Sequence, residues 1–176
     1  MNKKNKKLKI ALAGLGFGKK VHLEALKESH YLTPAAIYHY DKTQKSILGK
    51  ETGLEFFHDW EELVKSPEID GIIIATPPES RFKLAKKALE NNKNLLLEKP
   101  VSISSSEIEE LQRISLINKL SVCVDFEYRA VPLFLQTKKL IDENILGEIY
   151  LVKLDWLMGS RSDPKRAWNW YSLEEK

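Results

Sequence analysis

Short apolar runs alternate with helical patterns along the first 126 residues of the chain. Runs such as 72–75 and 95–97 are nearly continuous, which is typical of parallel strands covered on both faces. Strands are expected at residues 8–13, 35–40, 54–57, 71–75, 94–97 and 121–126. Strands that alternate with helices imply right-handed crossovers, so we predict an α/β fold built on a doubly wound parallel Rossmann sheet.

Two of the intervening helices carry start signals. Asp59 with Glu62, and Ser104 with Glu107, both fit a capping box. The second box precedes apolar residues at helical spacing, namely Ile108, Leu111, Ile114 and Ile117. A helix is therefore expected to begin next to each box.

The pattern changes after Phe126. Pro132 suits the first turn of a helix and Gly147 its end. Residues 148–156 then alternate between apolar and polar, which predicts a strand with two unlike faces. A lone strand cannot bury its apolar face. We expect a Rossmann domain at residues 1–126, then the start of an incomplete second α/β domain at residues 127–176, whose exposed strand would favour self-association.

Composition describes a soluble globular protein, with 43% hydrophobic and 30% charged residues. The net charge is only +3, and the lysines before residue 10 are interpreted as a solvated tail, since no basic patch with interleaved aromatic residues follows. No apolar stretch approaches the roughly 20 residues that span a bilayer. The lone Cys123 excludes a disulfide framework. We expect a cytoplasmic protein without nucleic-acid, membrane or metal partners.

A glycine-rich turn, GLGFG, follows the first strand and precedes a helical pattern. Gly14 permits a tight turn, and Gly16 lets the backbone approach phosphates without a Cβ. The helix start adds unpaired N–H groups and a positive dipole end. We predict that the turn (Gly14, Gly16, Phe17 and Gly18) binds the pyrophosphate of a dinucleotide. An ordinary glycine turn is the alternative, because the usual third glycine position holds Lys19.

Asp41 follows the second strand and is a second candidate for cofactor binding. An acidic side chain at this strand end accepts hydrogen bonds from both ribose hydroxyls, which favours NAD. His39, Lys42 and Lys45 would instead suit the 2′-phosphate of NADP, so both cofactors remain open. The other interpretation of Asp41 is a plain turn residue.

The ends of the fourth and fifth strands carry the remaining candidates. Thr76 and Pro77 lie where chain reversal in an open sheet places ligands, and the two successive prolines leave a flat apolar wall. They also fit a simple loop punctuation. Lys99, in Glu98-Lys99-Pro100, is the candidate catalytic residue, because an amine there would donate to a substrate hydroxyl or carbonyl oxygen. A surface salt bridge is the alternative.

Taken together, this order of motifs resembles the Gfo/Idh/MocA oxidoreductase family over roughly residues 9–171. The resemblance rests on the glycine turn, Asp41, Ala75-Thr76-Pro77, Glu98-Lys99-Pro100-Val101, residues 122–129, Pro132 and Gly147-Glu148-Ile149. It implies a Rossmann domain that binds NAD or NADP, and a C-terminal α/β domain with an open antiparallel sheet that completes the active site and mediates oligomerisation.

The resemblance also implies a reaction and the roles of residues. Hydride would pass between the nicotinamide and a hydroxyl or carbonyl carbon of a small molecule, commonly a sugar, an inositol or a related compound. Glu98 would contact the nicotinamide ribose, and Lys99 the substrate and the nicotinamide. Thr76 and Pro77 would line the nicotinamide half of the cofactor.

Two departures from the family pattern shape the expectations. Arg81 stands where the family often has a histidine, and the chain ends at Lys176, where a glycine-rich stretch with a proton-transferring aspartate and histidine would begin. His22, on the first helix, is interpreted as a partly buried helical residue. We expect weak or no turnover by the 176 residues alone. The alternative is a non-catalytic nucleotide-binding fragment or half of a split enzyme, with a second copy or a complementing C-terminal polypeptide as partner.

Overall fold

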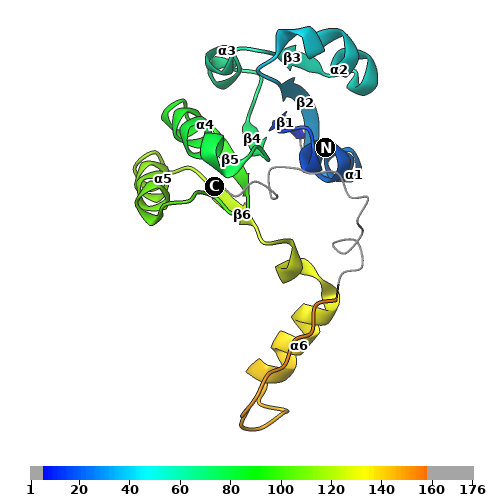
Figure 1. The fold of residues 1–176 in the computed structure, drawn as a ribbon, viewed down its shortest axis with the longest axis vertical. Coiled ribbons are helices and arrows are strands. Elements are labelled where there is room, and N and C mark those ends of the chain that lie inside the picture. The colour runs from blue at the N-terminus through cyan, green and yellow to red at the C-terminus, as the bar shows by residue number, and fades with distance from the viewer. Residues whose placement is uncertain (1–5, 158–176) are drawn as a thin grey trace, which may run out of the picture. The chain divides into compact units, whose positions relative to one another are not determined.

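A computed structural model describes residues 6–157 of the chain, and its first compact unit is a parallel six-stranded sheet with helices on both faces (Figure 1). The strands are β1 (Leu8–Ala13), β2 (Leu32–Tyr38), β3 (Glu55–Phe57), β4 (Gly71–Ile74), β5 (Asn94–Glu98) and β6 (Val122–Asp125). Their spatial order is β3-β2-β1-β4-β5-β6. This order confirms the predicted doubly wound Rossmann sheet.

Helical segments connect the strands of this unit. They are the π-helical turn η1 (Gly18–His22), α1 (Leu23–Glu28), the 3-10 turn η2 (Lys42–Gln44), α2 (Lys45–Thr52), α3 (Trp60–Lys65), α4 (Pro78–Glu90) and α5 (Ser105–Ile117). Each crossover returns the chain to the same sheet edge, so the strands all run in one direction.

Alternation along the strands divides the core into two layers. In β1, Ala11 and Ala13 join the larger cluster with the apolar residues of α3, α4 and α5. Ile10 and Leu12 point into the second cluster, which includes Leu23 of α1. Successive side chains of a strand face opposite ways, so one apolar run supplies both layers. The central strands β1 and β4 are therefore buried on both faces over most of their length, as their continuous apolar runs predict, whereas Cys123 of β6 is exposed.

The two expected capping boxes differ in outcome. Asp59 is the N-cap residue of α3 as predicted, but its side chain accepts from the Glu61 backbone N–H, at 2.8 Å, rather than from that of Glu62. Ser104 is the N-cap residue of α5, but its side chain makes no capping hydrogen bond. The hydroxyl of Ser102 bonds Glu107 in place of the Ser104 group: it donates to the Glu107 carboxylate and accepts from the Ser104 N–H. The Ser104 capping box is thus wrong, because Glu107 finds a hydroxyl donor earlier in the loop.

Residues 127–176 form the second compact unit, of which the structure describes residues up to 157. It contains the 3-10 turn η3 (Glu127–Ala130) and α6 (Pro132–Asp142), with the proline in the first turn as predicted. The helix ends before Gly147, contrary to expectation, because Asn144 adopts the left-handed conformation and Ile145 N–H bonds back to Leu140 O at 3.1 Å.

The strand expected at residues 148–156 is not formed in the described part of this unit. A strand is stabilised by hydrogen bonds to a neighbouring strand, and residues 127–157 provide none. Trp156 instead packs its ring edge-on against Tyr128 at a centroid distance of 4.8 Å. The assignment of residues 127–176 as the start of a second α/β domain stays a prediction. Among residues 6–157, none of the helices has the length and apolar character needed to cross a membrane.

Candidate functional site

Strands β2 and β3 are added on one side of β1, and strands β4 to β6 on the other, so the topological switch point lies between β1 and β4. The loops that follow these two strands meet there. Ala75 N–H donates to Ala13 O at 2.7 Å, directly beyond the paired strands. Gly14 has φ +97°, and a Cβ on it would lie 2.4 Å from the carbonyl carbon and oxygen of Ala75. Only glycine fits this contact. In open α/β sheets this switch point is where ligands bind.

The other two glycines of the turn have different surroundings. A Cβ on Gly18 would lie 3.1 Å from a methyl carbon of Leu12, so Gly18 packs closely on β1. A Cβ on Gly16 would meet no atom within 4 Å. Gly16 therefore borders open space just before the helix formed by η1 and α1. This is the cradle that a pyrophosphate would fill, because it has exposed backbone and no side chain.

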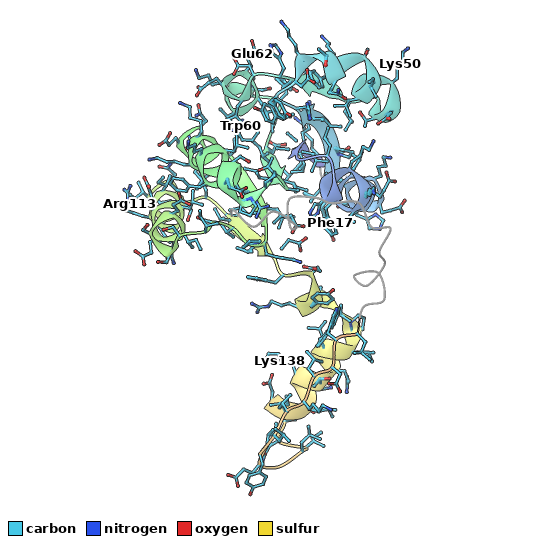
Figure 2. All side chains as sticks on the ribbon, in the orientation of Figure 1. Phe17, Lys50, Trp60, Glu62, Arg113 and Lys138 are labelled. Carbon is cyan, nitrogen blue, oxygen red and sulfur yellow. The ribbon has the colours of Figure 1, made fainter. Side chains whose placement is uncertain are left out.

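Phe17 lies between these glycines, and Figure 2 labels it beside the first helix. Its ring stands edge-on to the His22 ring, with centroids 5.4 Å apart. The side chain is about half exposed. Phe17 is therefore placed to cover His22 while its backbone belongs to the predicted pyrophosphate site.

Asp41 lies in the turn after β2 and caps η2. Its Oδ1 accepts hydrogen bonds from the backbone N–H and the hydroxyl of Thr43, at 2.9 and 2.7 Å. These bonds stabilise the charged carboxylate and hold the pKa of Asp41 below its ordinary value. The structure thus shows a turn role for one oxygen of Asp41. Its contact with a ribose stays a prediction.

Thr76 and Pro77 form the turn between β4 and α4. The hydroxyl oxygen of Thr76 is buried and has no hydrogen-bond partner among the residues that the structure describes. Buried hydroxyls are nearly always satisfied, so an orphaned one marks a place where a ligand or water belongs. Together with the open cradle at Gly16, this atom fits a bound dinucleotide on the predicted side of the sheet.

Arg81 explains one departure from the family pattern. It is only 3% exposed, and its guanidinium donates to the backbone oxygens of Glu98, at 2.5 Å, and of Thr76 and Pro100. One side chain therefore fastens the turn after β4 to the segment after β5. The sequence contained a signal: Arg81 shares the buried stripe of α4 with Ala85, Ala88 and Leu89.

The sequence analysis missed a cluster formed by the buried residues His22 and Glu98 and the half-buried Asp125. His22 Nε2 lies 2.9 Å from Glu98 Oε1 and 3.6 Å from Asp125 Oδ2. The three groups offer metal-ligating atoms within 4.8 Å of one another. A hydrogen bond between imidazole and carboxylate already accounts for the shortest of these distances. His22 is buried as a helical residue, but it faces charged partners.

The candidate catalytic residue Lys99 follows this cluster. It is exposed, and its backbone N–H donates to Glu98 Oε2 at 3.2 Å. The peptide bond between Lys99 and Pro100 is cis. Glu98 ends β5 opposite Asp125 of β6, so both acids lie at the carboxyl edge of the sheet with the glycine turn. The structure thus places the predicted residues after the carboxyl ends of neighbouring strands: the glycine turn after β1, Asp41 after β2, Thr76 and Pro77 after β4, and Lys99 after β5.

Comparisons with known proteins agree with this geometry. Residues 8–126 match the Gfo/Idh/MocA family model, described as an oxidoreductase family with an NAD-binding Rossmann fold. The chain is 38% identical over 174 residues to an uncharacterized oxidoreductase of Synechocystis sp., covering 98% of this chain and 47% of that protein. It is 27% identical over 152 residues to the glucose-6-phosphate 3-dehydrogenase of Bacillus subtilis, covering 86% of this chain and 43% of that protein.

A solved structure extends the likeness to three dimensions. The scyllo-inositol dehydrogenase from Lactobacillus casei, with bound cofactor NAD(H) and scyllo-inositol, superposes with a TM-score of 0.75 at 25% identity. The match covers 81% of this chain and 43% of that chain. This chain therefore spans less than half the length of each of these relatives.

Proposed function

The chain belongs to the Gfo/Idh/MocA oxidoreductase family, and from this premise we propose that residues 1–126 bind NAD or NADP at the carboxyl edge of the sheet. The reaction proposed for the protein is hydride transfer between the nicotinamide and a hydroxyl or carbonyl carbon of a sugar-like or cyclic polyol substrate. The observation that carries the proposal is the open cradle at Gly16. It lies beside the close backbone contact between Gly14 and Ala75, at the point between β1 and β4 where the strand order switches.

Each candidate residue has a role in this proposal. The backbone at Gly14, Gly16, Phe17 and Gly18 would hold the pyrophosphate. Thr76 would offer its orphaned hydroxyl to the nicotinamide half, beside the apolar ring of Pro77. Glu98 would accept hydrogen bonds from the nicotinamide ribose. These contacts orient the cofactor, which supplies the hydride when bound.

Lys99 would act on the substrate. Its ammonium group would donate a hydrogen bond to the substrate oxygen, which stabilises negative charge as a hydroxyl is oxidised or a carbonyl reduced. Its exposed position directly after the buried Glu98 supports this role, because substrate and cofactor would then meet at one peptide unit. Turnover of sugars and inositols with NAD and NADP, followed by the absorbance of the reduced cofactor, tests the proposed reaction.

Gly16→Val is expected to weaken binding of NAD(H) or NADP(H) at least tenfold, since a branched side chain would occupy the space of the pyrophosphate. The free protein should keep its stability, because a Cβ at this position meets no neighbour within 4 Å. Isothermal titration calorimetry of both variants measures the effect. Gly49→Val, at a glycine inside α2 with equally open surroundings, is the matched control. A folded wild-type protein that binds neither cofactor refutes the proposal.

Asp41→Ser is expected to raise the affinity for NADP relative to NAD by about tenfold, because a carboxylate repels the 2′-phosphate. The lowered pKa of Asp41 keeps this charge at neutral pH. Serine still caps η2, so the turn should survive. Asp41→Asn, which keeps the shape and removes the charge, should shift the ratio in the same direction. An unchanged ratio in both variants would leave Asp41 with its turn role alone.

A further inference from the structure

We propose that His22 is a positioning residue that holds the Glu98 carboxylate in the orientation needed to bind the nicotinamide ribose. This inference rests on the proposed cofactor function. Its basis is the buried pair itself: the two side chains come from residues 76 positions apart, and their nearest atoms lie 2.9 Å apart. His22 is 7% exposed and Glu98 8%, so water hardly competes for this hydrogen bond.

Both oxygens of the Glu98 carboxylate have a hydrogen-bond partner in the structure. Oε1 faces His22 Nε2, and Oε2 accepts from the Lys99 backbone N–H at 3.2 Å. A buried carboxylate is costly unless such bonds compensate the lost hydration. The backbone donor is tied to the chain beside Glu98. The imidazole is therefore the donor that fixes the side chain from outside its own strand.

The bond to Glu98 determines which ring nitrogen of His22 carries the proton. An ionised carboxylate only accepts hydrogen bonds, so the bond to Glu98 requires the imidazole proton on Nε2. Asp125 Oδ2 lies 3.6 Å from the same nitrogen. Without the imidazole, the two carboxylates would face each other within 4.8 Å and repel. Repulsion would turn Glu98 away from its present orientation.

His22 also connects two parts of the proposed cofactor site. It is the last residue of η1, which starts at Gly18 of the glycine turn, whereas Glu98 ends β5. The hydrogen bond between His22 and Glu98 therefore links the part of the proposed site for the pyrophosphate to the part for the nicotinamide. The imidazole of His22 bonds the Glu98 side chain, so its loss should weaken contacts to the nicotinamide half more than contacts to the pyrophosphate half.

Two ligands separate this role from a general structural one. NADH contains the nicotinamide ribose, whereas ADP contains only the adenosine and pyrophosphate half. His22→Leu is expected to weaken NADH binding about tenfold, the cost of one hydrogen bond to a charged group. Its affinity for ADP should stay within about twofold of the wild type. Calorimetry on the full chain measures both, with His30→Leu as the control at an exposed histidine.

Conservative variants test the hydrogen bond itself. His22→Gln can place an amide N–H near the position of Nε2 and should restore most of the NADH affinity, whereas the shorter side chain of His22→Asn should not. Circular dichroism confirms that each variant is folded. Equal losses for NADH and ADP, or unchanged NADH affinity in both His22→Leu and His22→Asn, would overturn the positioning role. Failure of the wild type to bind either ligand would overturn the proposed cofactor function as well.

Discussion

Arg81→Met is expected to lower the free energy of unfolding by about 3–5 kcal/mol, because it leaves three backbone oxygens without their donor. Methionine matches the apolar stem of arginine but supplies no donor. The backbone oxygens of Thr76, Glu98 and Pro100 would then lose the guanidinium that now reaches all three. A buried group left unsatisfied costs about 1–3 kcal/mol, and this applies most fully to the oxygen of Glu98, since the bonds to Thr76 and Pro100 are only partly buried.

Urea denaturation followed by circular dichroism measures this loss. Arg113→Met, at an exposed arginine of α5, is the matched control and should change the free energy of unfolding by no more than about 0.5 kcal/mol. Arg81→Lys should recover little, because one ammonium cannot reproduce the fork of the guanidinium. A variant Arg81→Met as stable as Arg113→Met would show that the three backbone oxygens find water instead.

Gly14→Ala is expected to cost about 3 kcal/mol or more, because two penalties combine. The backbone has φ +97°, which alanine adopts only with strain. The new methyl would also lie 2.4 Å from the main chain of Ala75, which cannot move without disturbing the hydrogen bond from Ala75 N–H to Ala13 O. Close-packed interiors yield little to such an overlap.

Thermal and urea denaturation of Gly14→Ala measure the penalty. Gly49→Ala provides the opposite reference, because this glycine lies inside α2 and its Cβ would meet no neighbour. Alanine should stabilise the helix there by about 0.5–1 kcal/mol. If Gly14→Ala unfolded at the same denaturant concentration as the wild type, the tight contact between the two turns would be refuted.

The strands were predictable because each is a local apolar run, and β2 shows where such local inference stops. The strand was expected at residues 35–40, which leaves Pro34 outside it. The strand begins at Leu32 instead. The pairing with β1 shifts between Ile10, which lies opposite Pro34, and Ala11, which lies opposite Ala36. Ala35 is therefore left without a partner in β1, and the strand continues through the proline. A bulge of this kind depends on the neighbouring strand, which the local sequence does not show.

The candidate site divides in the same way. The glycine turn could be predicted because its residues are adjacent and their chemistry is local. The cluster of His22, Glu98 and Asp125 could not, since the sheet order brings together the ends of η1, β5 and β6 from distant parts of the chain. The helical spacing of Arg81 with Ala85, Ala88 and Leu89 indicated a buried position, but its three partners are backbone oxygens that no sequence motif identifies.

The loops at the two ends of the parallel strands differ in how well they should tolerate insertions. The site residues converge on the carboxyl ends of β1, β4 and β5. The opposite edge is made of return turns such as Asn91-Asn92 before β5, where Asn92 has a left-handed backbone. Inserted peptides, affinity tags or fluorescent labels placed at those return turns would be about one strand length from the proposed cofactor site. The amino edge is therefore the natural place to modify the molecule while leaving its chemistry intact.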